Sequence, residues 1–365
     1  MKEKETKTGV GETLYDPKAA EVVLNGLATL SKEVKQSAIS LDDTQIKIIL
    51  DNYYKTQEYR KYLANQVRAA KEILPIDNKS LLAVSWLLAD IENREEQIKK
   101  LIAQYVKNNP VCEWASWTKG IGPVFAANLY SYLDLSKCTH ANQFIAYCGL
   151  NNNNAPWLGT AKSTEIVNEA YKHFGLSAKD PADERVILRV AMAAGRSVIS
   201  VRRGFENHKK KQKKKISDKN ALMGYMAKPP YNRDLQKICF LIGESFTKVS
   251  NRDSLYGRLY KERKAWEEMQ NENLAYAEQA EKMLKEYNYG KDTETFKYLS
   301  KGKLSPAHIN RRAQRYATKI FLTHFFEACY IHKYQKEPPV IYPIAHLGHA
   351  DYIKPEVPYK QLWRK

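Results

Sequence analysis

The chain is organised around the stretch WTKGIGPVFAANL, residues 117–129. Gly120 and Gly122 can adopt backbone conformations, or permit a close approach, that a Cβ atom would prevent. Ile121 between them would anchor a bend in the core, and Pro123 suits the first position of a helix, where a missing N–H costs nothing. The stretch predicts a helix-hairpin-helix bend, and the amides at the N-terminus of its second helix would bind a phosphate oxygen.

The hairpin stretch is part of a longer pattern. GIGPVFAA at 120–127 is followed by LDLSK at 133–137 and by AYCGL at 146–150. This core resembles the C-terminal domain of the DEDD-type insertion-sequence transposases, also called bridge recombinases (the insertion sequence 116/110/902 family). It departs from the family's pattern at Asp134, which lacks a preceding glycine, and at Ala146, which directly precedes the tyrosine.

A later segment is similar to one subgroup of the same family. PPYNRDLQK at 229–237, followed by IGESF at 242–246, matches short relatives in phages and mobile elements that lack the family's RuvC-like catalytic domain. The resemblance implies a DNA-binding protein with a role in DNA transposition or recombination. It transfers no catalytic carboxylate, because residues 1–110, where that domain would lie, show helical patterns and no strand that ends in Asp.

The charge balance indicates a polyanionic partner. The 365 residues include 59 Lys and Arg against 41 Asp and Glu, a formal net charge of +18, and such an excess favours nucleic acid or an anionic membrane. A membrane is the weaker interpretation, because no apolar run approaches the roughly 20 residues that span a bilayer and the N-terminus is no signal peptide. The five scattered cysteines form no Cys-x-x-Cys pair, so we expect a reduced, intracellular protein. The resemblance implies a cytoplasmic, nucleoid-associated protein of bacterial or phage origin.

Apolar residues recur at helical spacing through most of the chain and alternating strand patterns are almost absent, so the predicted fold class is all-α. Two long apolar stripes, at 46–70 and 84–105, predict a helix pair that acts either as a stalk or as a dimerisation arm for a homo-oligomer. The predicted organisation is a disordered N-terminus at 1–15, a coiled-coil-like hairpin arm at 16–110, a hairpin DNA-binding domain at 111–250 with a basic insertion at 196–220, C-terminal helices at 251–336 and an extended, proline-rich tail at 337–365.

Positive charge is densest at Lys209–Lys215, where each lysine that neutralises a phosphate would add to the salt dependence of binding. The alternative is a solvated face that only keeps the protein soluble. A second row of cations at 311–319, on a helix expected at 303–332, leaves the same two alternatives open. The predicted contacts to DNA, or to structured RNA, are Lys119, Gly120, Ile121, Gly122, Arg196, Arg202, Arg203, Lys209, Lys210, Lys211, Lys213, Lys214 and Lys215.

Candidate catalytic groups are few. Ser163 is the nearest match to the serine nucleophile that the related transposases carry after the Gly-Leu motif, although their Ser-Gly pattern is missing. His346, His349 and Asp351 have metal-ligand side chains at close spacing, which fits a metal site or a hydrogen-bonded structural cluster. No cofactor is identified, and Mg²⁺ or Mn²⁺ would be required only if the protein cleaves nucleic acid.

Three functions are compatible with these patterns. The first is a DNA-binding transposase or recombinase component, which acts alone or with a separate catalytic partner. The second is a non-catalytic protein that binds or shapes nucleic acid. The third is a metal-dependent nuclease built on the C-terminal histidines.

Overall fold

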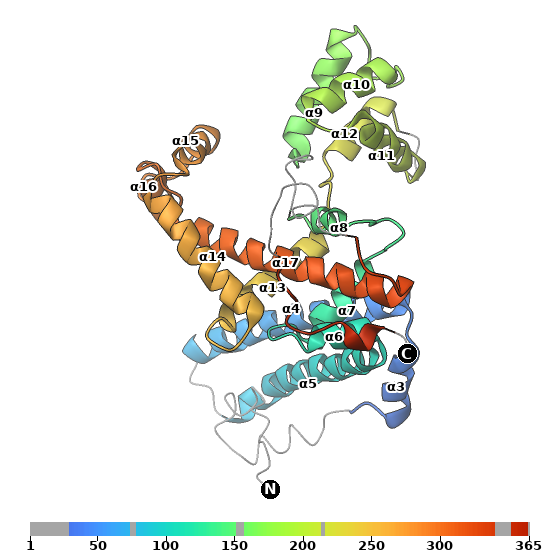
Figure 1. Cartoon of the computed structure of the whole chain (residues 1–365), viewed down its shortest axis with the longest axis vertical. Coiled ribbons are helices and arrows are strands. Elements are labelled where there is room, and N and C mark those ends of the chain that lie inside the picture. The colour runs from blue at the N-terminus through green and yellow to red at the C-terminus, as the bar shows by residue number, and fades with distance from the viewer. Residues whose placement is uncertain (1–28, 74–77, 151–156, 213–215, 340–351, 364–365) are drawn as a thin grey trace. The chain divides into compact units, whose positions relative to one another are not determined.

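The computed structural model describes residues 29–73, 78–150, 157–212, 216–339 and 352–363, and in these ranges it contains helices and no strand (Figure 1). The predicted all-α fold class is therefore confirmed. The N-terminal segment that was expected to be disordered lies outside the described residues.

Polar side chains at the N-caps determine where several helices begin. Asn109 accepts hydrogen bonds from the amides of Val111 and Cys112, and Asn232 accepts one from Leu235. The helices are α3 (Lys32–Ser37), α4 (Asp43–Ile73), α5 (Asn78–Asn108), α6 (Pro110–Ser116), α7 (Pro123–Tyr132), α8 (Ala141–Tyr147), α9 (Gly159–His173), α10 (Glu184–Ala193), α11 (Val198–Lys210), α12 (Asp218–Met226), α13 (Arg233–Lys248), α14 (Leu255–Glu272), α15 (Ala277–Glu286), α16 (Glu294–Leu299) and α17 (Pro306–Tyr334), with short 3-10 turns η1 (Ala38–Ser40) and η2 (Lys360–Leu362).

The helices form two compact units. The first comprises residues 1–133, 328–337 and 356–365, and the second comprises residues 134–327 and 338–355. Helix α17 contributes residues to both. The hairpin helices α6 and α7 belong to the first unit, because α7 packs against α4 and α5. The organisation expected from the sequence had grouped the hairpin with the chain that follows it.

In the first unit, α4 and α5 pack along one another as an antiparallel pair. Arg60 Nε donates to Glu95 Oε2 at 2.6 Å, and Asn108 at the end of α5 donates to the carbonyl oxygen of Ile39, just before α4, at 3.1 Å. These two contacts show that α4 and α5 run in opposite directions. Apolar side chains from both helices fill the seam between them: Leu63, Val67, Leu88 and Ile91.

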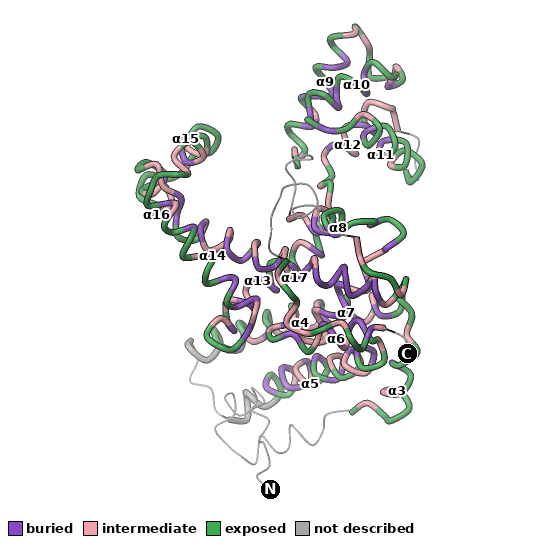
Figure 2. The backbone as a smooth tube through the Cα atoms, viewed as in Figure 1, coloured by how far each residue is buried: buried purple, intermediate pink, exposed green. Residues whose placement is uncertain are grey.

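In the second unit, α9 to α12 form a lobe with a core of its own. Helix α9 packs against α10 and α12, and α11 packs against the same two helices. Figure 2 shows that the buried positions of these helices face inward. The core includes Ile166, Val167, Ala170, Tyr171, Val186, Ile187, Val190, Val201, Phe205, Leu222 and Met226.

A cluster of aromatic rings joins α13, α14 and α17. Phe246 stacks on Tyr256 with ring centroids 5.0 Å apart, and Phe321 meets Tyr256 edge-on at 5.3 Å. Gly257 allows the start of α14 to pass close to the preceding chain, because a Cβ atom there would lie 2.8 Å from the Cα atom of Ser250. This close approach positions α14, which carries part of the cationic surface described below.

We expect Gly257→Ala to lower the free energy of unfolding of the second unit by about 1–3 kcal/mol, because the added methyl group meets main-chain atoms that have no room to move. Thermal or urea unfolding followed by circular dichroism measures the loss. Gly290→Ala is the matched control, because its Cβ would lie 3.5 Å from the nearest atom, a methyl group of Thr293. Equal stability of the two variants would contradict the close approach.

Candidate nucleic-acid interface

The predicted hairpin bend is present between α6 and α7. Gly120 has a φ of +93°, a left-handed conformation that favours glycine. Gly122 has a φ of −93° and a ψ of 172° as the N-cap of α7, and Pro123 is the first residue of that helix. Ile121 is 3% exposed and its amide donates to the carbonyl oxygen of Thr118 at 3.0 Å. The bend is thus held by its own backbone and by the buried isoleucine.

A carboxylate from the C-terminal segment occupies one amide of this bend. The amide of Lys119 donates to Glu356 Oε1 at 3.0 Å. The same segment is attached to α6, where Trp114 Nε1 donates to the carbonyl oxygen of Val357 at 2.8 Å and the Trp114 ring lies 5.4 Å from that of Tyr359. A phosphate oxygen that approached the Lys119 amide would have to displace Glu356.

Glu356 could not have been identified from local patterns, since 237 residues separate it from Lys119. A carboxylate is nevertheless the type of ligand that a bend with outward amides attracts, because its negative charge strengthens the hydrogen bond. The indole of Trp117, which is 52% exposed, lies in the same bend and remains available for contacts.

We expect Glu356→Ala to weaken the protection of the Lys119 amide against hydrogen exchange about fivefold, which corresponds to the loss of about 1 kcal/mol for one hydrogen bond. Hydrogen–deuterium exchange of the peptide that covers the bend measures the change. Glu337→Ala removes an exposed carboxylate from the same unit and should leave that exchange unchanged. Unaltered exchange in Glu356→Ala would show that the carboxylate does not hold the bend in solution.

The AYCGL segment at 146–150 and the PPYNRDLQK segment at 229–237 contact each other in the second unit. The amide of Asn232 donates to the carbonyl oxygen of Tyr147 at 2.9 Å, and its side chain donates to the Tyr147 hydroxyl at 3.2 Å. Gly149 has a φ of +76°, and a Cβ atom there would lie 3.0 Å from the ring of Tyr231. AYCGL and PPYNRDLQK therefore form one structural joint between α8 and α13.

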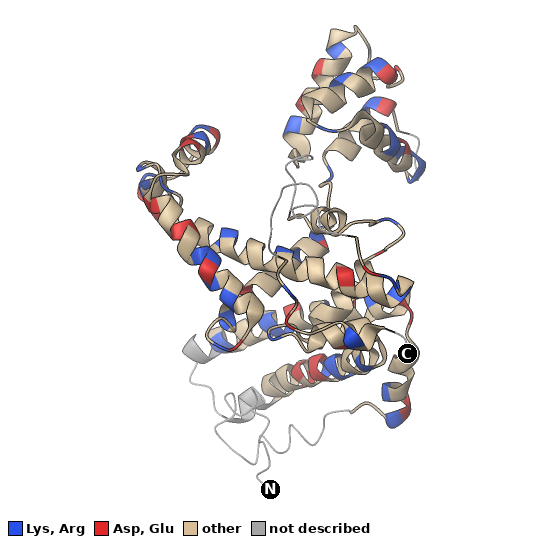
Figure 3. Ribbon diagram, viewed as in Figure 1, with Lys and Arg blue, Asp and Glu red and all other residues tan. Residues whose placement is uncertain are grey.

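The lobe of α9 to α12 carries the densest positive charge. Residues 157–228 include sixteen Lys and Arg against seven Asp and Glu, an excess of nine that is half of the chain's net charge of +18. Figure 3 shows basic residues along α11 and at its C-terminal end. The lysines at 213–215 lie outside the described residues.

The predicted contacts on α11 divide into paired and unpaired cations. Arg202 forms an ion pair with Glu184, and Lys209 forms one with Asp218. Arg203, Lys210 and Lys211 are exposed, and none of the three forms an ion pair within the described chain. Buried Val201 and Phe205 hold the opposite face of α11 in the lobe core, so the three unpaired cations point away from it.

Arg196 lies inside the lobe, in contrast to the surface role expected for it. The residue is 9% exposed, and its Nη1 atom lies 3.9 Å from the Sδ atom of Met226. Burial lowers the pKa of Arg196, and a hydrogen bond with Tyr225 partly offsets the effect. This burial could not be predicted from local patterns, because arginine is mostly exposed in folded proteins.

The candidate catalytic groups do not assemble into a site. Ser163 is fully buried in the lobe core, and its hydroxyl has no hydrogen-bond partner among the described residues. His346, His349 and Asp351 lie outside those residues. Where side chains are described, no group of three His, Cys, Asp or Glu residues could hold a metal ion.

His324 attaches the segment at 352–355 to α17. Its Nε2 atom lies 2.7 Å from the carbonyl oxygen of Ile353, which can only accept, so Nε2 carries the proton. Nδ1 then accepts from the hydroxyl of Tyr256 at 2.8 Å. Burial lowers the pKa of His324 to about 4, although the hydrogen bond to Ile353 acts in the opposite direction. Nearby, Glu327 accepts from the hydroxyl of Tyr352 at 2.5 Å.

His324 has a pKa near 6.5 in the unfolded chain and about 4 in the folded chain. Between these values the unfolded chain binds more protons than the folded chain, so the stability of the fold decreases as the pH falls. The contribution of His324 is therefore complete above pH 6.5 and is lost as the pH falls to 4. The contribution is about 3 kcal/mol at most. We expect His324→Gln to be less stable than the parent at pH 7, with a gap that narrows towards pH 4. Thermal unfolding across this range measures the gap, and a gap that stays constant from pH 7 to pH 4 would contradict this role of His324.

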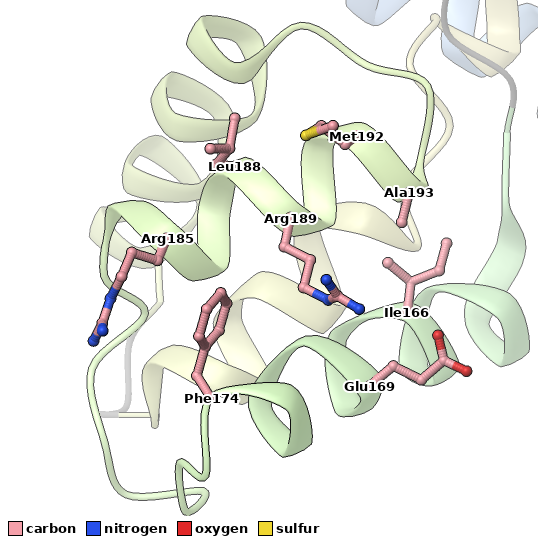
Figure 4. A pocket seen from close by; sticks show the side chains of 8 residues that line it. All are labelled: Ile166, Glu169, Phe174, Arg185, Leu188, Arg189, Met192 and Ala193. Carbon is pink, nitrogen blue, oxygen red and sulfur yellow. The ribbon is translucent and has the colours of Figure 1, made fainter.

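A shallow groove of about 480 Å³ lies between α9 and α10 (Figure 4). Its apolar floor includes Met192, which is 72% exposed, and Leu188, which is 47% exposed. Arg185 lies at one end with its guanidinium 5.4 Å from the ring of Phe174. The groove contains one carboxylate, Glu169, and no nucleophile or histidine, so its chemistry is that of an apolar contact surface.

No protein-family model matches this chain, and no curated protein and no solved structure is significantly similar to it. None of the described helices is both long enough and apolar enough to cross a membrane.

Proposed function

We propose that this protein binds nucleic acid, with duplex DNA as the preferred ligand, and that helix α11 provides the main contact. The observation that carries the proposal is the row of exposed cations Arg203, Lys210 and Lys211, which have no ion-pair partner in the described chain. A phosphate backbone would supply the missing negative charge and release counterions when it binds.

The structure of α11 suits this role. Its last turn carries Lys209 and Lys210, and cations at a helix C-terminus interact favourably with the helix dipole. The lobe core fixes α11 through Val201 and Phe205, so the cationic face is preorganised before a ligand arrives. Contacts of this type position a protein on the backbone and carry little sequence information.

The hairpin bend is the second proposed contact. Lys119 contributes an exposed side chain, and Trp117 contributes an exposed ring. A phosphate at this position would compete with Glu356 for the Lys119 amide, so the bend would bind more weakly than a bend without that carboxylate. The resemblance of residues 117–150 to insertion-sequence transposases supports a role in DNA transposition or recombination.

We expect the triple variant Arg203→Ala, Lys210→Ala, Lys211→Ala to bind a DNA duplex at least about tenfold more weakly at ~0.1 M salt, because three phosphate contacts are lost. The slope of log affinity against log salt should fall in magnitude by about 0.9 for each contact removed. Fluorescence anisotropy with a labelled duplex, repeated at several salt concentrations, measures both quantities.

The charge-matched control is Lys32→Ala, Lys61→Ala, Lys107→Ala, which removes three exposed lysines from the first unit. This control should stay close to the parent affinity. If both triple variants lose the same affinity, the net charge alone drives association and α11 is not the contact. The same titration repeated with a labelled single-stranded RNA tests the preference for duplex DNA.

A protein that shapes nucleic acid without cleaving it is the second candidate, favoured by the burial of Ser163 away from solvent. A supercoiled-plasmid nicking assay with Mg²⁺ or Mn²⁺ separates this candidate from a recombinase. If the Ser163→Ala variant still nicks the plasmid and the double variant His346→Ala, His349→Ala does not, the protein is the metal-dependent nuclease that the C-terminal histidines suggest.

A further inference from the structure

A second cationic face lies on α17 in the second unit. His308, Arg312, Arg315 and Lys319 follow one another at intervals of three or four residues, so their side chains share one face of the helix. Arg311 lies at the edge of the same face. The face adjoins α14 and α13, whose side chains contact several of these cations directly.

Two carboxylates hold three of the arginines in this region. Glu267, with a side chain only 1% exposed, pairs with Arg263 at 2.7 Å and with Arg312 at 2.6 Å. Glu244 pairs with Arg311 at 2.6 Å. Burial would raise the pKa of Glu267, but hydrogen bonds from Tyr276, Arg312 and Arg263 lower it below its ordinary value. Both carboxylates are thus ionised and already engaged.

Aromatic rings fix the same three guanidinium groups. The Cζ atom of Arg311 lies 3.9 Å from the ring centroid of Phe240, and that of Arg312 lies 4.4 Å from that of Tyr276. Arg263 lies 4.1 Å from the ring centroid of Trp266. These arginines are therefore part of the fold, and they leave no carboxylate for the remaining cations.

Arg315 and Lys319 are the cations that remain. Arg315 is exposed, and its Nε atom donates only to the carbonyl oxygen of Arg311, at 3.4 Å. Lys319 is half-buried, and neither side chain forms an ion pair within the described residues. Although Arg315 as a residue keeps an exposed surface, packing around the two head groups lowers the pKa of both Arg315 and Lys319, and the nearby arginines lower it further. Half-buried His308 adds a donor, and burial together with Arg315 and Arg312 lowers its pKa as well.

The cluster therefore has an uncompensated positive charge. Five permanent cations, namely Arg263, Arg311, Arg312, Arg315 and Lys319, surround two carboxylates, Glu244 and Glu267. The mutual repulsion of these cations in a partly buried position would be relieved by an anion that reaches Arg315 and Lys319 from the solvent side.

We propose that Arg315 and Lys319, assisted by His308, bind phosphate groups of a nucleic-acid backbone and form a contact surface separate from α11. The Arg315 guanidinium can donate two parallel hydrogen bonds to one phosphate, and the Lys319 ammonium adds a point charge one helical turn away. The choice of nucleic acid as the source of the phosphate rests on the proposed function, and the spacing of the three side chains along one face of α17 suits successive phosphates of one backbone.

The test is the double variant Arg315→Gln, Lys319→Gln in the full chain. We expect its affinity for a DNA duplex to fall about tenfold at ~0.1 M salt and its salt slope to fall in magnitude by about 2, because two phosphate contacts are lost. The matched control is Lys291→Gln, Lys301→Gln, which removes two exposed lysines of the same unit and should change the affinity less than twofold.

Thermal unfolding separates this role from a structural one. Because Gln removes an uncompensated charge, the double variant should unfold at the same temperature as the parent or at a higher one. A lower unfolding temperature together with parent-like affinity would assign the two residues to folding and overturn the proposal.

The outcomes also separate the inference from the proposed function. If the α11 triple variant loses affinity while the α17 double variant behaves like its control, the proposed contact on α11 is supported and the proposed contact on α17 is wrong. If the parent chain binds neither DNA nor RNA, the proposed function fails. Tripolyphosphate then decides whether an anion site exists, because it should raise the unfolding temperature of the parent and not that of the double variant. An equal rise in both would overturn the site.

Discussion

A chain with 59 cationic and 41 acidic side chains has to fold against its own positive charge. In the second unit, the most deeply buried carboxylate has cations around it. Arg263 and Arg312, which keep part of their surface in solvent, both pair with the interior carboxylate of Glu267, because a buried charge without a partner would cost several kcal/mol. Most of the remaining cations of this unit lie where water reaches at least part of the side chain, and Arg196 is an exception. The cationic faces of α11 and α17 belong to this distribution of charge.

The hairpin bend also has an anionic partner, and this partner is a side chain of the same protein. Its Lys119 amide donates a hydrogen bond to the carboxylate of Glu356, and Trp114 and Tyr359 hold that segment against α6. One amide of the bend is therefore engaged by a carboxylate from the same chain. The AYCGL segment serves the fold in a similar way, because Tyr147 and Asn232 connect α8 to α13. Motifs that suggest binding thus also organise the helices.

Periodicity and turn residues were enough to predict the all-α fold, the two long arm helices and the bend with Pro123 at the start of α7. The prediction of surface cations succeeded less evenly. Arg203 and Lys210 are exposed as expected, whereas Arg196 is buried beside Met226. All three are basic residues within fifteen positions of one another, so composition could not distinguish them. The exposure of Arg203 and Lys210 depends on which face of α11 meets the lobe core, whereas Arg196 lies before α11 and packs into the lobe beside Met226.

Sequence alone determined the helical class, the positive charge and the bend, because each of these depends on residues that are close together in the chain. Tertiary structure decided which cations have a partner. Glu356 reaches Lys119 across 237 residues, and Arg312 meets Glu267 across 45. Contacts at such separations arise only when the helices pack, and Arg315, Lys319 and the outer cations Arg203 and Lys210 of α11 form no ion pair among the described residues.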